Sequence, residues 1–374
     1  KLNKINFILY YFILMTLTVK ITFIIFLIFI TILFIYTQVN ESFVSYKRCD
    51  SKPLNGITKE IFDTNNITKS RDDDWEIYIP CGYNGVEREL KELDELNEKQ
   101  SIYGIDGCDK IVAKNGLWKI ILTEYGFKKA SEIMPTTYLL EDPKHMEEFE
   151  SQFNKDNIYI LKRNVQRKKG IKISNDLYEI TNSKYDNFKL VQDMKESYLI
   201  NDRKFNIRLY MLIVSNGNST KVYLHKLNKL LYASQKVNLS NKLDFNSNIT
   251  NSYIASKDIY NSHPFNIKEL EKITNDNNIT NQVKEKMFLL SRAIVLPLNK
   301  LDKLKKTLKF QLFGVDAIYD KNGDIFILEI NKGPDMIAKD ERDKKMKKKV
   351  ISDTFQKIEM INDNANEFNL YEEI

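Results

Sequence analysis

Residues 310–333, FQLFGVDAIYDKNGDIFILEINKG, constrain the fold more than any other segment of this sequence. Two apolar runs flank Asn322-Gly323, and an Asn-Gly pair between alternating hydrophobic residues is a strong signal for a hairpin closed by a type I′ turn. That turn pairs Lys321 with Asp324 and continues residue for residue along both strands. The segment therefore predicts an antiparallel hairpin with a defined register.

This register places Asp316 opposite Glu329, and Asn331 lies on the same face opposite Gly314. Opposed carboxylates destabilise a sheet unless a cation neutralises them. Two carboxylates and an amide oxygen suit a hard cation such as Mg²⁺ that also holds phosphates. We therefore predict a metal site at Asp316, Glu329 and Asn331. The alternative is a half-exposed hairpin whose polar face carries unrelated acidic residues.

From the length and composition of the chain we expect a globular protein without a disulfide framework. The chain has 374 residues, of which 43% are hydrophobic, which is enough for a sizeable core. Its net charge of +6, from 57 basic and 51 acidic residues, is only mildly basic, and we predict no nucleic-acid partner. Cys49, Cys81 and Cys108 are odd in number and widely spaced, which argues against disulfides or structural zinc and is compatible with a reducing compartment.

Residues 5–39 form the most apolar segment of the chain. A helix over residues 21–39 would be about 28 Å long, close to the thickness of the hydrocarbon core of a bilayer. We therefore predict a membrane anchor in residues 1–39 with its spanning helix at 21–39, and a catalytic part that faces the cytoplasm. A cleaved signal peptide and a buried core helix are the alternatives.

Residues 40–100 are predicted to be a polar linker with an accessory helix, and residues 101–374 a mixed α/β domain. Within that domain a strand ends at Lys162, a basic loop leads to Gly170, and a second strand ends at Gln192. A lysine at a strand end before a basic loop suits contact with nucleotide phosphates. A solvated basic turn is the alternative.

In this order, the segments resemble the tubulin–tyrosine ligase-like family of ATP-grasp ligases. The resemblance runs from about residue 100 to 335. It rests on Asp109-Lys110 with the helix that follows, MPTTYLL (134–140), YILKR (159–163), KGI (169–171), VQDM with YLINDRKFNIRLYMLI (191–213), NITNS (248–252), FGVDAIYD (313–320) and LEINKGP (328–334).

The resemblance implies a mixed α+β ATP-grasp fold in which two lobes hold ATP between them. It also implies site residues of four kinds. They are Lys110, Lys162 and Lys169 for the phosphates; Gln192, Asp193 and Met194 for the adenine; Lys204, Arg208 and Asn251 for the substrate carboxylate or acyl phosphate; and Asp316, Glu329 and Asn331 for Mg²⁺.

The function implied is an ATP- and Mg²⁺-dependent ligase that joins an amino acid to a protein carboxylate through an acyl phosphate. The candidate acceptor is an acidic protein, with the tubulin C-terminal tail foremost, and the enzyme is expected to be a monomer. Three positions depart from the family pattern: Lys168 replaces a glycine of the phosphate loop, Asn206 an aspartate and Leu231 an arginine. These departures keep open a non-catalytic, membrane-tethered nucleotide-binding module, as well as an ATP-grasp ligase with a non-tubulin substrate.

The basic run KKMKKK (344–349) could attract acidic partners through long-range electrostatics. Such a run is more often the solvated face of a helix, here with Met346 and Val350 turned inward. We favour the second interpretation.

Overall fold

The computed structural model describes residues 22–31, 44–93, 96–165, 170–217, 219–238, 243–250, 259–301, 307–362 and 368–374. Residues 22–31 are helical, whereas residues 21 and 32–39 of the predicted membrane helix lie outside the described part. Among the helices described, none is both long enough and apolar enough to cross a bilayer.

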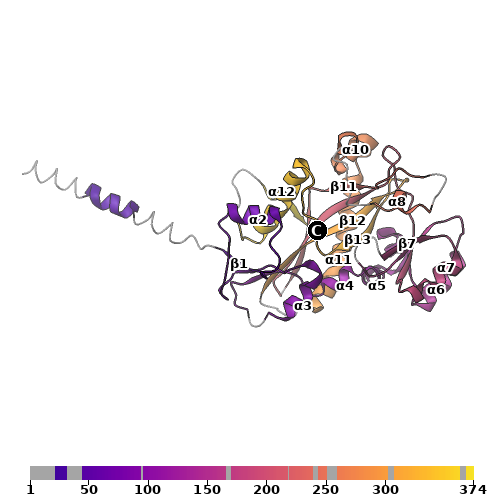
Figure 1. Cartoon of the computed structure of the whole chain (residues 1–374), viewed down its shortest axis with the longest axis horizontal. Coiled ribbons are helices and arrows are strands. Elements are labelled where there is room, and N and C mark those ends of the chain that lie inside the picture. The colour runs from indigo at the N-terminus through magenta and orange to yellow at the C-terminus, as the bar shows by residue number, and fades with distance from the viewer. Residues whose placement is uncertain are drawn as a thin grey trace, which may run out of the picture. The chain divides into compact units, whose positions relative to one another are not determined.

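Residues Ser45–Ile374 form one compact unit of mixed α/β structure, which confirms the predicted class (Figure 1). Its strands are β1 (Ser45–Lys47), β2 (Thr68–Lys69), β3 (Ile77–Tyr78), β4 (Ser101–Tyr103), β5 (Thr137–Leu139), β6 (Tyr159–Lys162), β7 (Ile171–Ser174), β8 (Leu190–Asp193), β9 (Phe205–Ser215), β10 (Thr220–His225), β11 (Lys229–Tyr232), β12 (Leu308–Tyr319), β13 (Ile325–Asn331) and β14 (Tyr371–Glu373). Its helices are α2 (Gly56–Thr64), α3 (Val86–Lys91), α4 (Cys108–Val112), α5 (Lys114–Ile133), α6 (Pro143–Gln152), α7 (Leu177–Asn182), α8 (Phe245–Asn248), α9 (Ile259–Ser262), α10 (Ile267–Thr274), α11 (Ile279–Leu301) and α12 (Glu341–Lys357).

Ten of these strands form one mixed sheet in the order β14-β10-β9-β12-β4-β3-β1-β2. The long strands β9 and β12 lie antiparallel at its centre. Strand β11 pairs with β9 beyond the end of β10, and β13 pairs with β12 beyond the end of β4. Because β9 and β12 are long, each of them joins two shorter strands to the same sheet.

The two faces of β12 serve different purposes. Its odd-numbered residues, such as Phe313 and Val315, are buried in the main core, which also contains residues of α5 and α11. Among its even-numbered residues is Phe310, whose ring lies 6.1 Å from that of Phe355 on α12. Further along the same face come Gly314 and Asp316. The even face is therefore apolar beneath α12 and polar beyond it.

A second, four-stranded antiparallel sheet has the order β5-β8-β6-β7 and lies with α6 and α7 at one end of the unit (Figure 1). It has its own core, in which Tyr138, Phe149 and Tyr159 pack edge to face or at a tilt. The strands that the sequence places around Lys162 and Gln192 are thus confirmed and belong to one sheet.

The segment predicted to be a polar linker is instead part of the fold. Strands β1, β2 and β3 extend the large sheet, and Phe62 of α2 packs on Phe355 of α12 with ring centroids 5.0 Å apart. The sequence is misleading here because the strands are only two or three residues long, too short to show an alternating pattern.

The cysteine interpretation was wrong for one pair. Cys49 and Cys81 form a disulfide, with Cα atoms 5.7 Å apart, while Cys108 is free and buried. Each bonded cysteine follows the end of a strand, β1 or β3, and these strands are parallel neighbours in the sheet. Sequence spacing could not show that pairing, because the two cysteines are brought together by the sheet.

The central hairpin forms where it was predicted, but its turn differs. The Asp320 N–H donates to Asp324 O at 2.9 Å, and the Gly323 N–H donates to Asp320 O at 3.1 Å. Of the turn residues only Gly323 has a positive φ, 87°. This is a three-residue loop with glycine in the left-handed region rather than a type I′ turn. The predicted pairing of Lys321 with Asp324 is therefore wrong.

The longer turn shifts the register by one residue, so that Tyr319 lies opposite Ile325. A β-bulge between Asp316 and Ala317 then removes the shift. Beyond the bulge Asp316 faces Glu329, as predicted. Two local irregularities that the sequence did not reveal compensate each other before the polar residues are reached.

Candidate active site

The centre of the site is a row of charged residues across three neighbouring strands. In the register of the sheet, Arg208 of β9 lies opposite Asp316 of β12, which lies opposite Glu329 of β13. Arg208 Nε and Nη2 donate to Asp316 Oδ1 and Oδ2 at 2.6 and 3.1 Å. Both side chains are nearly buried, so this bidentate pair is well shielded from water. Burial alone would lower the pKa of Arg208, but Asp316 outweighs it and the pKa is raised.

Asn331 joins this row from the next position on the same face. Its Nδ2 donates to Asp316 Oδ2 at 3.1 Å, and it lies opposite Gly314 in the ladder. A Cβ atom on Gly314 would lie 3.1 Å from Arg208 Cδ and 3.1 Å from Pro334 Cβ. Glycine at this position leaves room for Arg208 to reach Asp316. The three predicted metal ligands are therefore brought together on one face.

Lys114, rather than the predicted Lys110, supplies a cation to this row. Lys114 Nζ lies 3.4 Å from Glu329 Oε2, whereas Lys110 is exposed on α4. Ala113 has extended backbone angles (φ −66°, ψ 124°) that separate α4, which carries Lys110, from α5. Lys114 is thus the first residue of α5. In the sequence, the indication that Lys114 could take this role is its position four residues after Lys110.

Lys162 approaches from the four-stranded sheet and is held there by an amide. Its Nζ donates to Gln192 Oε1 at 2.7 Å, and Gln192 Nε2 donates to Thr137 Oγ1 at 2.7 Å. Burial lowers the pKa of Lys162 to about 8, with Glu329 acting to raise it and Lys114 to lower it further. Lys162 is close enough to the hairpin to be affected by its carboxylates, so the two sheets contribute to one site.

The cations decide the protonation state of Glu329. Burial acts to raise its pKa, but Lys114, Lys162 and Arg208 outweigh that effect and the pKa is lowered. Glu329 is therefore a carboxylate at neutral pH. Three cations surround two carboxylates, Asp316 and Glu329, which leaves about one net positive charge for an anion to neutralise.

Asp193 and Met194, which were also predicted for the nucleotide, lie in or beside the four-stranded sheet. Asp193 ends β8, and burial raises its pKa. The Met194 N–H donates to Ile158 O at 3.0 Å, which continues the pairing of the strand. Lys169 lies outside the described residues.

Lys204 directly precedes β9, and its backbone continues the pairing with the β11 side through the Ala233 N–H, so it shares a face with Arg208 four residues later. It is almost buried, its Nζ donates to Asn248 Oδ1 at 2.5 Å, and burial lowers its pKa to about 8. Asn251 lies outside the described residues. The partner that the structure shows for Lys204 is Asn248, from the same NITNS segment.

Two of the positions that depart from the family pattern face each other, while the third, Lys168, lies outside the described residues. Asn206 of β9 lies directly opposite Leu231 of β11, between Lys204 and Arg208 on the same face. An aspartate and an arginine at these positions would be an opposed charge pair, and both charges are missing here. The departure is thus one local change from a charged pair to a neutral pair.

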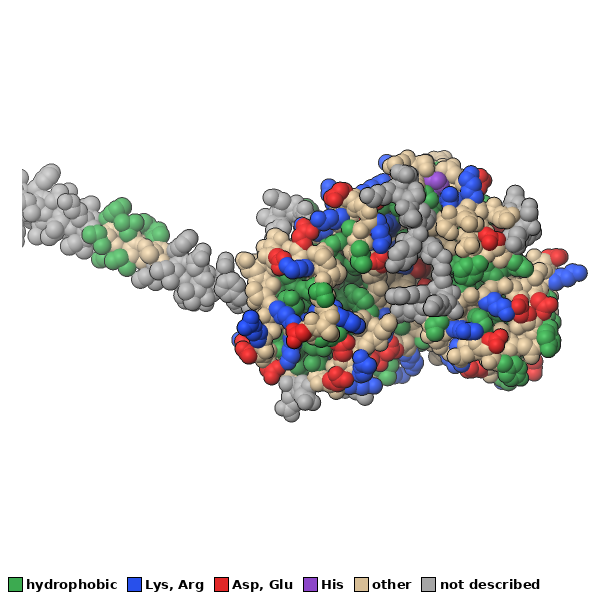
Figure 2. Space-filling view, viewed as in Figure 1, with side chains coloured by type: hydrophobic (Ala, Val, Ile, Leu, Met, Phe, Trp, Pro, Cys, Tyr) green, Lys and Arg blue, Asp and Glu red, His purple; other side chains and the backbone are tan. Residues whose placement is uncertain are grey.

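The basic run on α12 is a helix face that the protein neutralises internally. Lys344 and Lys348 both pair with Glu60 of α2, at 3.3 and 2.7 Å, and Met346 and Val350 are buried. Met346 and Val350 turn inward as predicted, but Lys347 is buried against Asp343 at 2.9 Å, so the run is not a wholly solvated face. Figure 2 likewise shows basic and acidic side chains intermingled over the visible face.

The donor set of the row fits Mg²⁺ and phosphate together. Asp316 and Glu329 offer carboxylate oxygens and Asn331 an amide oxygen, which are hard ligands of the kind that Mg²⁺ prefers. Lys114, Lys162 and Arg208 provide the positive charge that phosphate oxygens require. The arrangement can therefore hold a polyphosphate with its cation between the two sheets.

Comparison with known proteins gives a consistent result. The chain matches the Tubulin-tyrosine ligase family over residues 92–367. It is 24% identical over 298 residues to a probable beta-tubulin polyglutamylase of Tetrahymena thermophila, covering 71% of this chain and 24% of that protein. It is 22% identical over 247 residues to the probable tubulin polyglutamylase ttll-9 of Caenorhabditis elegans, covering 62% of this chain and 58% of that protein.

A third relative has a different named activity. Tubulin glycylase 3D of Tetrahymena thermophila is 27% identical over 229 residues, covering 55% of this chain and 22% of that protein. The chain thus spans less than two thirds of the length of each of these curated relatives.

The Arg208–Asp316 pair generates a stability prediction. Asp316→Asn leaves a nearly buried guanidinium without its charged partner, so we expect the free energy of unfolding to fall by about 3 kcal/mol. Asp324→Asn, the matched change at an exposed position of the hairpin turn, should alter it by less than about 0.5 kcal/mol. Urea denaturation followed by circular dichroism measures both. Equal stability of the two variants would contradict a structural role for the pair.

Proposed function

The chain belongs to the tubulin-tyrosine ligase family, and from that premise we propose that it is an ATP- and Mg²⁺-dependent ligase that joins an amino acid to a protein carboxylate, with tubulin as the acceptor. The observation that carries the proposal is the charged row of Arg208, Asp316 and Glu329, which faces Lys162 of the second sheet. Such a group suits transfer of a phosphoryl group, in which charge must be neutralised around the reacting oxygens.

In the proposed reaction the acceptor carboxylate takes the terminal phosphoryl group of ATP, which releases ADP and gives an acyl phosphate. The amino group of the incoming amino acid then attacks the acyl carbon, an amide bond forms, and phosphate leaves. The nucleotide would lie between the four-stranded sheet and the β12–β13 hairpin. This is the ATP-grasp arrangement expected from the sequence.

The residues of this chain would act mainly by position and charge. Lys162, fixed by Gln192, and Lys114 would bind phosphate oxygens. Arg208 would either stay on Asp316 and orient it or offer its outer N–H groups to the acyl phosphate. Asp316, Glu329 and Asn331 would hold Mg²⁺, which when bound supplies Lewis-acid stabilisation of the transferring phosphoryl group.

The amino acid to be joined is a separate question. Relatives of this chain are named for glutamylation and for glycylation of tubulin. Near Arg208 this chain offers Lys204 and the neutral pair Asn206 and Leu231. A substrate side chain that carries a negative charge gains less from a neutral pair than from an arginine, so this surface favours an amino acid with an uncharged side chain, such as glycine.

The second candidate function is a nucleotide-binding module without ligase activity. It is favoured by the same neutral pair, Asn206 and Leu231, because these strand positions beside Arg208 lack the two charges of the family pattern. The two candidates share the nucleotide site and differ in turnover.

Glu329→Gln tests the enzyme against the binding module. The side chain keeps its size and loses its charge, so ATP affinity in the presence of Mg²⁺ should weaken only a few-fold. The rate of ADP release with tubulin and a panel of amino acids should fall by about 100-fold, because the charge matters most when the phosphoryl group is transferred.

Asp324→Asn at the turn is the matched control and should keep the activity of the parent. ATP binding and ADP release would be measured for all three proteins. A parent that binds ATP yet releases no ADP with any amino acid would favour the binding module. Equal ADP release by parent and Glu329→Gln would refute the metal assignment.

The lowered pKa of Lys162 predicts the pH dependence of nucleotide binding. Its ammonium group is charged below about pH 8 and loses its proton as the pH rises through that value. ATP affinity should therefore fall by about tenfold for each pH unit above the pKa, until binding no longer depends on this lysine. An ordinary lysine would give no such loss below about pH 10.

Lys162→Arg is the control for this experiment. A guanidinium keeps its charge over the whole range, so the loss of affinity above pH 8 should be absent even if binding is weaker throughout. Isothermal titration calorimetry from about pH 7 to pH 9.5 would show this. The same decline in both proteins would assign the titration to another group.

The membrane anchor remains a prediction that rests on the sequence of residues 21–39. Within the described part, Phe23 to Ile30 are apolar side chains that are all at least about half exposed. We expect the full chain to stay in the membrane pellet after a carbonate wash and a chain starting at Glu41 to be released. Release of the full chain would contradict the anchor.

A further inference from the structure

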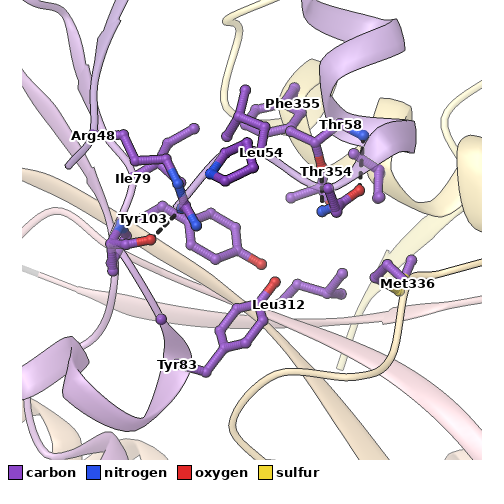
Figure 3. A pocket seen from close by; sticks show the side chains of 15 residues that line it. Arg48, Leu54, Thr58, Ile79, Tyr83, Tyr103, Leu312, Met336, Thr354 and Phe355 are labelled. Atoms are coloured by element: carbon purple, nitrogen blue, oxygen red, sulfur yellow. Dashed lines mark hydrogen bonds between the residues drawn. The ribbon is translucent and has the colours of Figure 1, made fainter. Parts of the chain in front are cut away.

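A pocket of about 210 Å³ lies apart from the charged row, between residues 48–83 and helix α12. Its lining includes Arg48, Leu54, Tyr83, Tyr103, Leu312 and Phe355. Figure 3 shows these side chains around one cavity, with Arg48 on one side and Met336 on the other. Much of this wall precedes residue 92, where the match to the family begins.

Arg48 is the charged group of the pocket. Its Nε donates to Lys52 O at 2.7 Å, Nη2 donates to Cys81 O at 3.2 Å, and Nη1 donates to Pro80 O. A guanidinium has five N–H groups, so among the described contacts two of them remain available. The carbonyl groups hold the side chain in place without neutralising its charge.

No carboxylate forms an ion pair with Arg48 among the residues that the structure describes. Glu89 acts on it from nearby, but its Oε2 already accepts from the Cys81 N–H at 2.8 Å and from the Tyr78 hydroxyl at 3.0 Å. Burial lowers the pKa of Arg48, but the ordinary pKa of an arginine is so high that the side chain stays cationic at neutral pH. An anion that entered the pocket would therefore meet an oriented positive charge.

Two tyrosine hydroxyls add further polar groups inside an apolar wall. In Figure 3 the hydroxyls of Tyr83 and Tyr103 point toward each other in the middle of the pocket. Burial raises the pKa of both, so both remain protonated at neutral pH; the two hydroxyls hydrogen-bond to each other, which leaves one hydroxyl proton to donate to a ligand. Leu54, Leu312 and Phe355 supply apolar surface around them.

The Cys49–Cys81 disulfide joins the two segments that carry this wall. Cys49 follows Arg48 directly, and Cys81 lies between Pro80 and Gly82, both of which line the pocket. The covalent link fixes Arg48 relative to the carbonyl groups that it binds. The pocket is thus built into the fold rather than left between loosely held segments.

The pocket is distinct from the nucleotide site, although both use the even face of β12. Leu312 lines the pocket, whereas Asp316, four residues further along, belongs to the charged row. Four residues of strand correspond to roughly 13 Å. Gly314 lies between them, with Pro334 and Arg208 close above it.

We propose that this pocket binds a small carboxylate with an apolar body. Arg48 and one hydroxyl of the Tyr83–Tyr103 pair would hold the carboxylate, and the leucines and Phe355 would cover the apolar part. The volume is smaller than that of pockets for drug-sized ligands, which is about 300–1,000 Å³, and larger than a cavity of about 150 Å³ that accepts benzene. One ring with a short acidic side chain fits this range.

The test compares 3-phenylpropanoate with its uncharged amide, 3-phenylpropanamide, by calorimetric titration of the full chain. The carboxylate should bind at least tenfold more tightly than the amide, because hydrogen bonds to a charged group are stronger than neutral ones. Equal affinity of the two probes, or no binding of either at about 10 mM, would overturn the proposal.

Two variants place the binding in this pocket. Arg48→Gln should remove the preference for the carboxylate, and Leu54→Phe, which fills part of the cavity, should weaken both probes by at least tenfold. The Leu54 variant keeps the test valid if Arg48→Gln does not fold. Unchanged affinity in Leu54→Phe would overturn the assignment.

Two further variants serve as controls. Leu296→Phe adds the same bulk on the exposed surface of α11, and Lys162→Ala removes a cation from the nucleotide site. Both should bind 3-phenylpropanoate as the parent does. Loss of binding in Lys162→Ala would place the carboxylate in the nucleotide site and refute the proposal.

Discussion

The ion pair between Arg208 and Asp316 is the interaction on which the rest of the site depends. It joins the two central strands of the large sheet, β9 and β12, at the position where the even face of β12 changes from apolar to polar. Because Asp316 receives Arg208 from one strand and faces Glu329 on the other, its position sets that of the whole row. A nearly buried guanidinium and carboxylate tolerate little displacement, since each would be left without a partner.

Lys162 shows how the second sheet completes the site. A buried lysine is costly, and its pKa of about 8 expresses that cost. Gln192 and the carboxylates of the hairpin offset part of it. The protein thus holds a cation ready for an anionic ligand at some expense in its own stability, which is common at functional sites. At this site three cations surround two carboxylates, whereas on α12 Lys344 and Lys348 are paired with Glu60.

Residues 45–83, which the sequence predicts to be a polar linker, contribute to both the central sheet and the pocket. Strands β1 to β3 extend the central sheet, the disulfide links two of their ends, and Tyr83 lies against Gly333, two residues after Asn331. The pocket at Arg48 and the charged row therefore share one structural element, the loop that follows β13. Both also use residues on the same face of β12, Leu312 for the pocket and Asp316 for the charged row.

The sequence by itself determined the mixed α/β class, the hairpin, and the sharing of one face by Asp316, Glu329 and Asn331, because alternation along a strand is a local property. Only the tertiary structure decided which strand lies beside β12, and hence that Arg208 neutralises Asp316, since neighbouring strands can be distant in sequence. It likewise replaced Lys110 by Lys114, through a break at Ala113, and joined Cys49 to Cys81 through parallel strands. The register of the hairpin was predicted correctly at the site although the turn was not, because the β-bulge removed the shift. Local patterns fix which residues share a face, whereas packing alone fixes which charges meet.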